Sequence, residues 1–109
     1  MRDDRLRLED IRDAVAQIER YSARGRQSFD EDELVRVWVL HHLQIIGEAC
    51  RGLSEEFRRT HPDEVWSDAI GFRNVLAHQY FGLDYEAVWS VVERDLPDLK
   101  NKVQQALEG

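Results

Sequence analysis

Cysteine, proline, glycine and basic residues are all scarce in this sequence. The one cysteine, Cys50, excludes an intramolecular disulfide and a cysteine-based zinc site. Only 2 prolines and 6 glycines interrupt the 109 residues, so long helices are permitted. No apolar run reaches the roughly 18 residues that a membrane span needs, and no signal-peptide pattern opens the chain. We therefore expect a cytoplasmic protein that does not contact a membrane.

The scarcity of basic residues restricts how the protein can hold nucleic acid. Lys and Arg number 15 against 22 Asp and Glu, which gives a net charge of −7. A protein that grips nucleic acid over a wide area needs a basic face, so an RNA substrate would have to be held in a local pocket. The hydrophobic fraction of 42% is ordinary for a folded domain. At this length we expect one domain, residues 1–109, that a partner subunit would help to stabilise.

Four segments carry apolar residues at spacings of three and four, which is the pattern of an amphipathic helix. No strand-like alternation, repeat or low-complexity segment appears. This pattern predicts an all-α, up-and-down bundle of four to five helices. The main helices are expected at residues 4–23, 31–53 and 65–77 and from residue 85 to near the C-terminus, with a short helical turn at 54–57.

The segments between these helices contain the residues that start and stop them. Residues 22–29 and 79–83 are expected to be loops, because each contains a glycine. Pro97 must either kink the last helix or stand in the first turn of a new helix that Asp95 caps. The other expected caps are Ser28 or Asp30 for the second main helix, Ser54 for the short turn and Asp84 for the last helix.

The second main helix is apolar on two sides, as expected of a helix in the middle of a bundle or in a subunit interface. Gly47 lies inside it, where glycine costs about 1 kcal/mol against alanine, so we expect it to permit a close approach of another helix. Cys50 is expected to be a small buried side chain. The two apolar stripes are Leu34, Trp38 and Ile45, and Val35, Val39 and Ile46.

An arginine, a histidine and a tyrosine stand at spacings of five and two near the expected end of the third helix. Arg73 and His78 lie about 140° apart around an ideal helix. They converge on one ligand only if the helix ends near His78, or if two copies of the motif meet across a dimer axis. The geometry favours a composite site in a homodimer, although the spacing alone also fits a helix-ending histidine and a surface arginine.

These residue types suit cleavage of RNA without a metal. RNA carries its own nucleophile, the 2′-hydroxyl. His78 fits the role of general base or acid, and Arg73 fits stabilisation of charge on the phosphoryl oxygens. Asn74, one helical turn before His78, can orient that histidine or donate to a phosphate oxygen. The products would be a 2′,3′-cyclic phosphate and a 5′-hydroxyl, and DNA would be inert because it lacks the nucleophile.

The motif Arg73-Asn74-x-x-x-His78-x-Tyr80-Phe81-Gly82 resembles the signature of the HepT-type HEPN ribonuclease toxins. The resemblance extends over nearly the whole chain, with the first 30 residues the least distinctive. The other segments that resemble the family are residues 45–49, 61–66, 69–72, 84–89 and 95–99.

The resemblance implies a homodimeric helical protein in which Arg73 and His78 are the ribonuclease residues. It also implies a partner, an MntA-like nucleotidyltransferase antitoxin of a type VII-like toxin–antitoxin pair. That partner uses ATP and a divalent metal to add AMP units to the motif tyrosine, here Tyr80. A modified Tyr80 would place negative charge and bulk beside the cleft and repel RNA phosphate. The chain itself would need no cofactor and hold no metal.

Several other residues have simpler explanations. Glu48 needs a partner if it is buried, and a structural salt bridge to Arg73 is favoured over a catalytic role. Tyr80 can also anchor its loop by packing. His41 and His42 diverge by about 100° on a helix, so they cannot easily share one metal. Neighbouring acidic residues favour a solvated face over an RNA path for the three arginines Arg51, Arg58 and Arg59.

Three functions therefore stand side by side. The first is a metal-independent endoribonuclease toxin that acts as a homodimer. The second is a non-catalytic helical module that binds a nucleotidyltransferase and serves as its substrate. The third is a nucleotide-binding helical domain that does not cleave. A variant that lacks the His78 imidazole separates the first from the other two.

Overall fold

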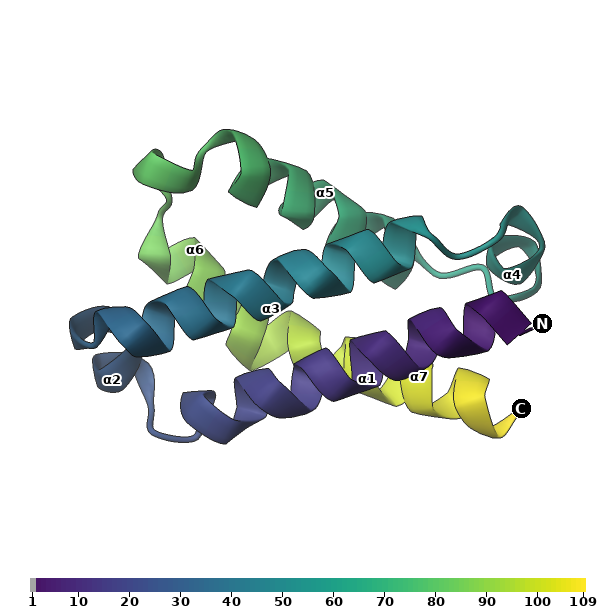
Figure 1. The fold of residues 1–109 in the computed structure, drawn as a ribbon, viewed down its shortest axis with the longest axis horizontal. Helices are drawn as coiled ribbons and strands as arrows, with labels where there is room; N and C mark the ends of the chain where they lie inside the picture. The colour runs from purple at the N-terminus through teal and green to yellow at the C-terminus, as the bar shows by residue number, and fades with distance from the viewer. Residues whose placement is uncertain (1) are drawn as a thin grey trace.

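The computed structural model describes residues 2–109, and within that range it contains helices and no strand (Figure 1). This confirms the predicted all-α fold. The elements are α1 (Arg2–Ser22), α2 (Arg26–Glu31), α3 (Glu33–Arg51), α4 (Glu55–Thr60), α5 (Glu64–His78), the 3₁₀ turn η1 (Tyr80–Gly82), α6 (Tyr85–Ser90), the π-helical turn η2 (Val91–Asp95) and α7 (Leu96–Glu108).

Four long rods form the bundle: α1, α3, α5, and the run of α6, η2 and α7. Figure 1 shows α3 across the middle of the molecule, with α1 on one side of it and α5 on the other, and both chain ends at the same end of the bundle. The helix α7 lies against α1 and also approaches α5. Among the described residues, no helix is both long and apolar enough to cross a bilayer.

The stripes predicted from spacing form the core. The four apolar residues of the α1 stripe are all buried, and so is one of the two predicted α3 stripes. Fully burying a side chain of this kind contributes about 1.5–3 kcal/mol, so these rows hold α1 and α3 together. The buried residues are Leu8, Ile11, Val15 and Ile18 of α1, and Val35, Val39 and Ile46 of α3.

The loop predicted at residues 22–29 is partly wrong, because Arg26–Glu31 forms the helix α2. Gly25 precedes it with a positive φ of 95°. The glycine therefore marks the turn before α2 and does not indicate a loop that continues to residue 29. Six residues have little helical stability by themselves. Phe29, which is fully buried, fixes α2 by packing against Trp89 with ring centroids 5.5 Å apart. Such a tertiary contact leaves no periodic signal in the local sequence.

The caps were predicted correctly at two helices and wrongly at two others. Ser54 accepts from the backbone N–H of Phe57 to cap α4, and Asp84 caps α6, as expected. The cap of α3 is Asp32 rather than Ser28 or Asp30, because α2 occupies those positions. Asp95 does not cap α7, since its backbone is already helical and its side chain makes no capping bond. Ser54, Asp84 and Asp32 each accept from the free backbone N–H groups at a helix start, whereas Asp95 does not.

Pro97 stands in the first turn of α7, and the rod runs through it without an intervening loop. Proline lacks an N–H and its ring crowds the carbonyl four residues earlier. The five residues Val91–Asp95 just before it adopt a π-helical turn, which widens the backbone at that point. Pro97 therefore stands in the first turn of a new helix, which is the second of the two expected alternatives, but Asp95 does not cap that helix.

One buried carboxylate joins the start of α1 to the turn before α4. Asp4, only 5% exposed, accepts from the backbone N–H of Ser54 at 2.8 Å and from its hydroxyl at 2.6 Å. The same hydroxyl caps α4 by accepting from Phe57 at 3.0 Å. Asp4 thus fixes the orientation of a capping side chain 50 residues away. The spacing of apolar residues in α1 does not predict that Asp4, in the first turn, is buried.

We expect Asp4→Ala to lower the free energy of unfolding by about 1–3 kcal/mol, because it leaves the partly buried Ser54 N–H without an acceptor. Chemical denaturation followed by circular dichroism measures the change. The neighbouring Asp3 is exposed, so Asp3→Ala is the matched control and should cost only a few tenths of a kcal/mol. Equal losses in the two variants would show that the Ser54 bonds do not contribute.

Candidate functional site

The helix α5 carries the Arg–His–Tyr motif and is held at both ends. Asp63 caps its first turn by accepting from the N–H of Val65 at 2.9 Å. Trp66 and Leu76 are its two buried side chains and anchor it to the core. The helix ends at His78, where the Gln79 N–H still donates to the Val75 carbonyl at 2.9 Å. The predicted end of the helix near His78 is therefore confirmed.

Arg73 is fixed by contacts on both sides. Its guanidinium pairs with the carboxylate of Glu48 on α3 at 3.1 Å, which confirms the predicted salt bridge. It also donates to the side-chain oxygen of Asn74 at 3.3 Å. The Glu48 side chain is 57% exposed and that of Arg73 28%, so the pair contributes little to stability. Its effect is to orient the guanidinium, which keeps further donors for a ligand.

Gly47 allows Arg73 to lie this close to α3. A Cβ placed on Gly47 would fall on the Cβ of Arg73 and 2.9 Å from the carbonyl oxygen of Ala69. The two helices therefore cross with backbone nearly against backbone, as predicted from the glycine inside α3. Because Gly47 precedes Glu48, the same crossing delivers both the space for Arg73 and the carboxylate that holds it.

His78 and Tyr80 lie at the exposed end of α5. The side chain of His78 is exposed and makes no hydrogen bond to any other described residue. Tyr80 is 40% exposed and Phe81 is fully exposed, with their rings edge to face at 5.5 Å. A turn bond from Gly82 N–H to the Gln79 carbonyl, 2.9 Å long, closes η1. The imidazole and the phenol are therefore both accessible to a large ligand or an enzyme.

Asn74 has a different partner from the one we expected. Its side-chain oxygen accepts from Arg73, so within the described chain it orients the arginine rather than His78. Arg73 and His78 themselves diverge around α5, as the spacing of five requires. One chain thus carries both groups near the same end of α5, but it does not bring them together.

Of the second predicted stripe of α3, Leu34 is 81% exposed, whereas Trp38 and Ile45 are half-buried; the other stripe is buried. Val37, which is 45% exposed, and the exposed His41 lie on the same outer face between Leu34 and Glu48. The two-sided apolar pattern of α3 is therefore explained by one buried side and one side available to a partner. That outer side leads directly to the Glu48–Arg73 pair.

Two of the remaining histidines and one of the three arginines have structural contacts. A ring nitrogen of the buried His42 lies 2.8 Å from the Trp38 carbonyl. His61 stacks on Phe57 with ring centroids 4.2 Å apart. Arg58, one of the three arginines considered for an RNA path, instead donates to the carbonyls of Cys50 and Arg51 at the end of α3. No group of three metal-ligating side chains comes together in residues 2–109.

Cys50 is fully buried, as predicted. Burial away from water disfavours the charged thiolate and raises the pKa of the Cys50 thiol to about 12, against a smaller lowering effect of the nearby Arg58. A thiol with such a pKa is neutral at physiological pH and is a poor nucleophile. Cys50 is therefore a packing residue rather than part of a reactive site.

Comparison with known proteins identifies a family. Residues 11–106 match the model of the family described as ribonuclease HepT-like. The chain is 35% identical over 99 residues to a Thermococcus cleftensis protein named "Probable ribonuclease HepT", covering 90% of each. It is 40% identical over 76 residues to a Methanocaldococcus jannaschii protein named "Putative RNase", covering 70% of each. No solved structure matches the chain.

We expect Gly47→Ala to destabilise the fold by about 1–3 kcal/mol through overpacking, even though alanine favours helix by about 1 kcal/mol. Gly71 on α5 is the matched control, since a Cβ there meets nothing within 4 Å. Gly71→Ala should leave stability unchanged or raise it. Thermal denaturation of both variants measures the difference, and a Gly47→Ala variant as stable as Gly71→Ala would contradict the close crossing.

Proposed function

Because this chain belongs to the HepT-like ribonuclease family, we propose that it is an endoribonuclease that cleaves RNA without a metal ion. The observation that carries the proposal is the end of α5. There, Arg73 is held by Glu48 at 3.1 Å, and the exposed His78 stands at the last helical position. One group suits the charge of a phosphate and the other suits proton transfer.

The chemistry uses the 2′-hydroxyl of the RNA as nucleophile. His78 removes the proton of that hydroxyl as the oxygen attacks the adjacent phosphorus. The bond from phosphorus to the 5′-oxygen breaks, and the leaving oxygen takes a proton from an acid or from water. Arg73 stabilises the negative charge that builds on the phosphoryl oxygens, and Asn74 holds its guanidinium. The products are a 2′,3′-cyclic phosphate and a 5′-hydroxyl, so DNA is not cleaved.

The active form is a homodimer that joins two motifs in one cleft. The support is the outer face of α3, where the exposed Leu34, Val37 and His41 and the half-buried Ile45 lead to Glu48 and so to Arg73. A two-fold axis beside this face buries it against its own copy. It also brings His78 of one chain toward Arg73 of the other. This arrangement is needed because the two residues diverge on a single helix.

The overall charge restricts the substrate. With a net charge of −7, the protein lacks the basic surface that holds a duplex by its phosphates. We infer that it takes an exposed single strand or loop whose bases are unstacked and whose shape fits the cleft.

We further propose that the chain is the toxin of a toxin–antitoxin pair and that its antitoxin is a nucleotidyltransferase. The target of that antitoxin is Tyr80, whose phenol is accessible at 40% exposure and lies two residues from His78. The phenol oxygen attacks the α-phosphorus of ATP and loses its proton, and pyrophosphate leaves. The attached AMP adds negative charge next to the cleft and repels RNA.

A second candidate function is favoured by the exposed Tyr80 alone. In it, the chain is a non-catalytic module that binds the nucleotidyltransferase and serves as its substrate. This function requires accessibility of the tyrosine but no chemistry at Arg73 or His78. The two candidates therefore differ in the fate of RNA and agree on the fate of Tyr80.

The first experiment is cleavage of a panel of RNAs by purified protein in EDTA, with end-group analysis of the products. We expect wild type to leave cyclic phosphate ends, and His78→Ala and Arg73→Ala to lose about 10²-fold or more of the rate. Gln79→Ala, which changes an exposed neighbour, should retain activity. Cleavage that requires added metal would overturn the mechanism. If wild type cleaves no RNA, the non-catalytic binding module is the remaining candidate function.

Modification is tested by incubating the chain with ATP, Mg²⁺ and a nucleotidyltransferase encoded beside it, followed by mass spectrometry. We expect mass increases in whole AMP units on wild type and none on Tyr80→Phe. Tyr85 is the matched control because its exposure of 41% is close to the 40% of Tyr80, and the Arg36 guanidinium lies over its ring at 4.7 Å. Tyr85→Phe should be modified like wild type. Loss of modification in Tyr85→Phe instead would show that Tyr85, and not Tyr80, is the modified residue.

A further inference from the structure

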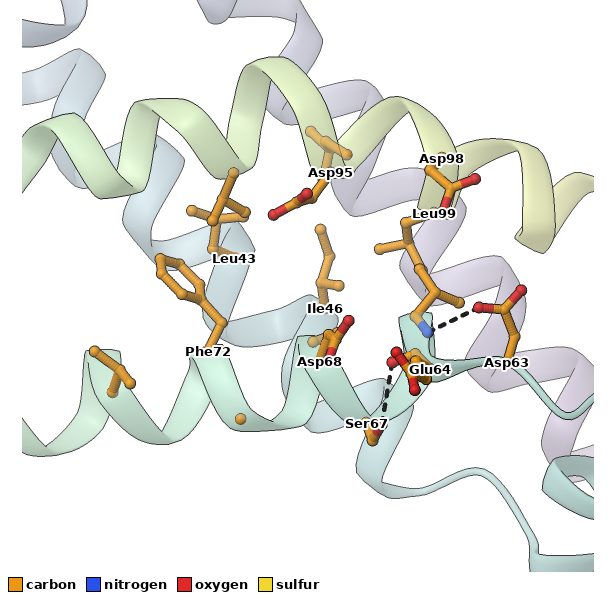
Figure 2. A pocket seen from close by; sticks show the side chains of 16 residues that line it. Leu43, Ile46, Asp63, Glu64, Ser67, Asp68, Phe72, Asp95, Asp98 and Leu99 are labelled. Atoms are coloured by element: carbon orange, nitrogen blue, oxygen red, sulfur yellow. Dashed lines mark hydrogen bonds between the residues drawn. The ribbon is translucent and has the colours of Figure 1, made fainter.

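A groove of about 550 Å³ lies between α5 and the η2–α7 part of the last rod, on the side of α5 away from Arg73. Its floor is apolar. Figure 2 shows Phe72 of α5, Leu43 and Ile46 of α3, and Leu99 of α7 in the space between the two helices. Leu43, Ile46 and Leu99 are buried in the core, whereas Phe72 is only partly covered.

Carboxylates line both walls of this groove. Asp68 belongs to α5, and Asp95 and Asp98 stand across from it on the last rod (Figure 2). With Asp63 and Glu64 they make five acidic residues, and no Lys, Arg or His is among the lining residues. Within the described part of the chain, only Asp63 has an ion pair, with Lys102 at 3.1 Å. The bonds from the Val65 N–H and from Lys102 lower the pKa of the Asp63 carboxyl.

The arrangement of the carboxylates restricts what the groove can hold. They follow the two walls instead of converging, and no three of the metal-ligating side chains in residues 2–109 form a metal site. RNA phosphate would be repelled by them. A second copy seated here across a two-fold axis would place one acidic rim against another, which is unfavourable. An occupant therefore has to combine an apolar surface with positive charge on both flanks.

We propose that this groove binds a cationic amphipathic helix of a partner protein. The apolar stripe of that helix covers Phe72 and Val75, which the fold leaves partly exposed, and its Lys or Arg side chains reach the carboxylates of both walls. The α5 residues that line the groove run from Glu64 to Val75, which is about 18 Å at 1.5 Å per residue. A helix of about three turns spans it.

The inference is independent of the proposed nuclease activity. Phe72 and Asp68 line the groove, whereas Arg73 packs against Gly47 and Glu48 on the other side of the α3–α5 contact. Neither Arg73 nor His78 is among the residues that line the groove. Failure of RNA cleavage and failure of helix binding are therefore separate results, and His78→Ala should bind the partner helix like wild type.

The probe is a fluorescent 14-residue peptide of Leu and Lys arranged as an amphipathic helix, with a scrambled peptide of the same composition. We expect the amphipathic peptide to bind wild type at least tenfold more tightly in fluorescence anisotropy. Amide shifts in NMR spectra should concentrate at the groove. The triple variant Asp68→Asn/Asp95→Asn/Asp98→Asn should lose at least tenfold in affinity.

The matched control removes the same charge from exposed positions elsewhere, as Asp3→Asn/Asp10→Asn/Glu56→Gln. It should bind the amphipathic peptide within about twofold of wild type, because the screened charges lie away from the groove. Equal binding of the two peptides, or equal losses of affinity in the two triple variants, would show that binding depends only on net charge. Either result would overturn the proposal. A change of oligomeric state in the groove variant, measured by sedimentation, would assign the groove to a second copy instead.

Discussion

The close crossing of α3 and α5 at Gly47 is the constraint on which the rest of the structure depends. Without a side chain at Gly47, the Cβ of Arg73 lies against the backbone of α3, and the carboxylate of Glu48 meets its guanidinium at 3.1 Å. A larger residue would push α5 outward, and the arginine, the helix end at His78 and the η1 turn would move with it. One missing methyl group therefore sets the position of every residue in the proposed site.

The sequence alone predicted the parts of the molecule that repeat or that meet at short range. The α1 stripe, the crossing at Gly47, the Glu48–Arg73 pair and the helix end at His78 all follow from spacing or from single residues with few alternatives. The helix α2 and the buried Asp4 were not predictable in this way. Phe29 and Asp4 depend on partners 60 and 50 residues away, Trp89 and Ser54, and such contacts leave no local pattern.

The sequence identifies the candidate site as a set of residues but not as a geometry. The order Arg73, Asn74, His78, Tyr80 marks them together, and the structure shows each one's accessibility and partners. It also reassigns the hydrogen bond of Asn74 from His78 to Arg73. Catalytic convergence is a property of two chains if α3 pairs through its outer face, and no feature of one sequence fixes the relative position of two copies.

The helix α5 is little buried for its position. Of its 15 residues only Trp66 and Leu76 are buried, while Val75 is 40% exposed and Phe72 is partly covered. Both of these apolar residues line the groove. A domain of this size has little stability to spare, so leaving that surface open is costly unless a partner covers it. The two sides of α5 differ in charge. The side facing Glu48 holds Arg73 and suits a phosphate, whereas the groove presents carboxylates and repels one. The proposed RNA site at Arg73 and the proposed helix-binding groove therefore use different faces of α5.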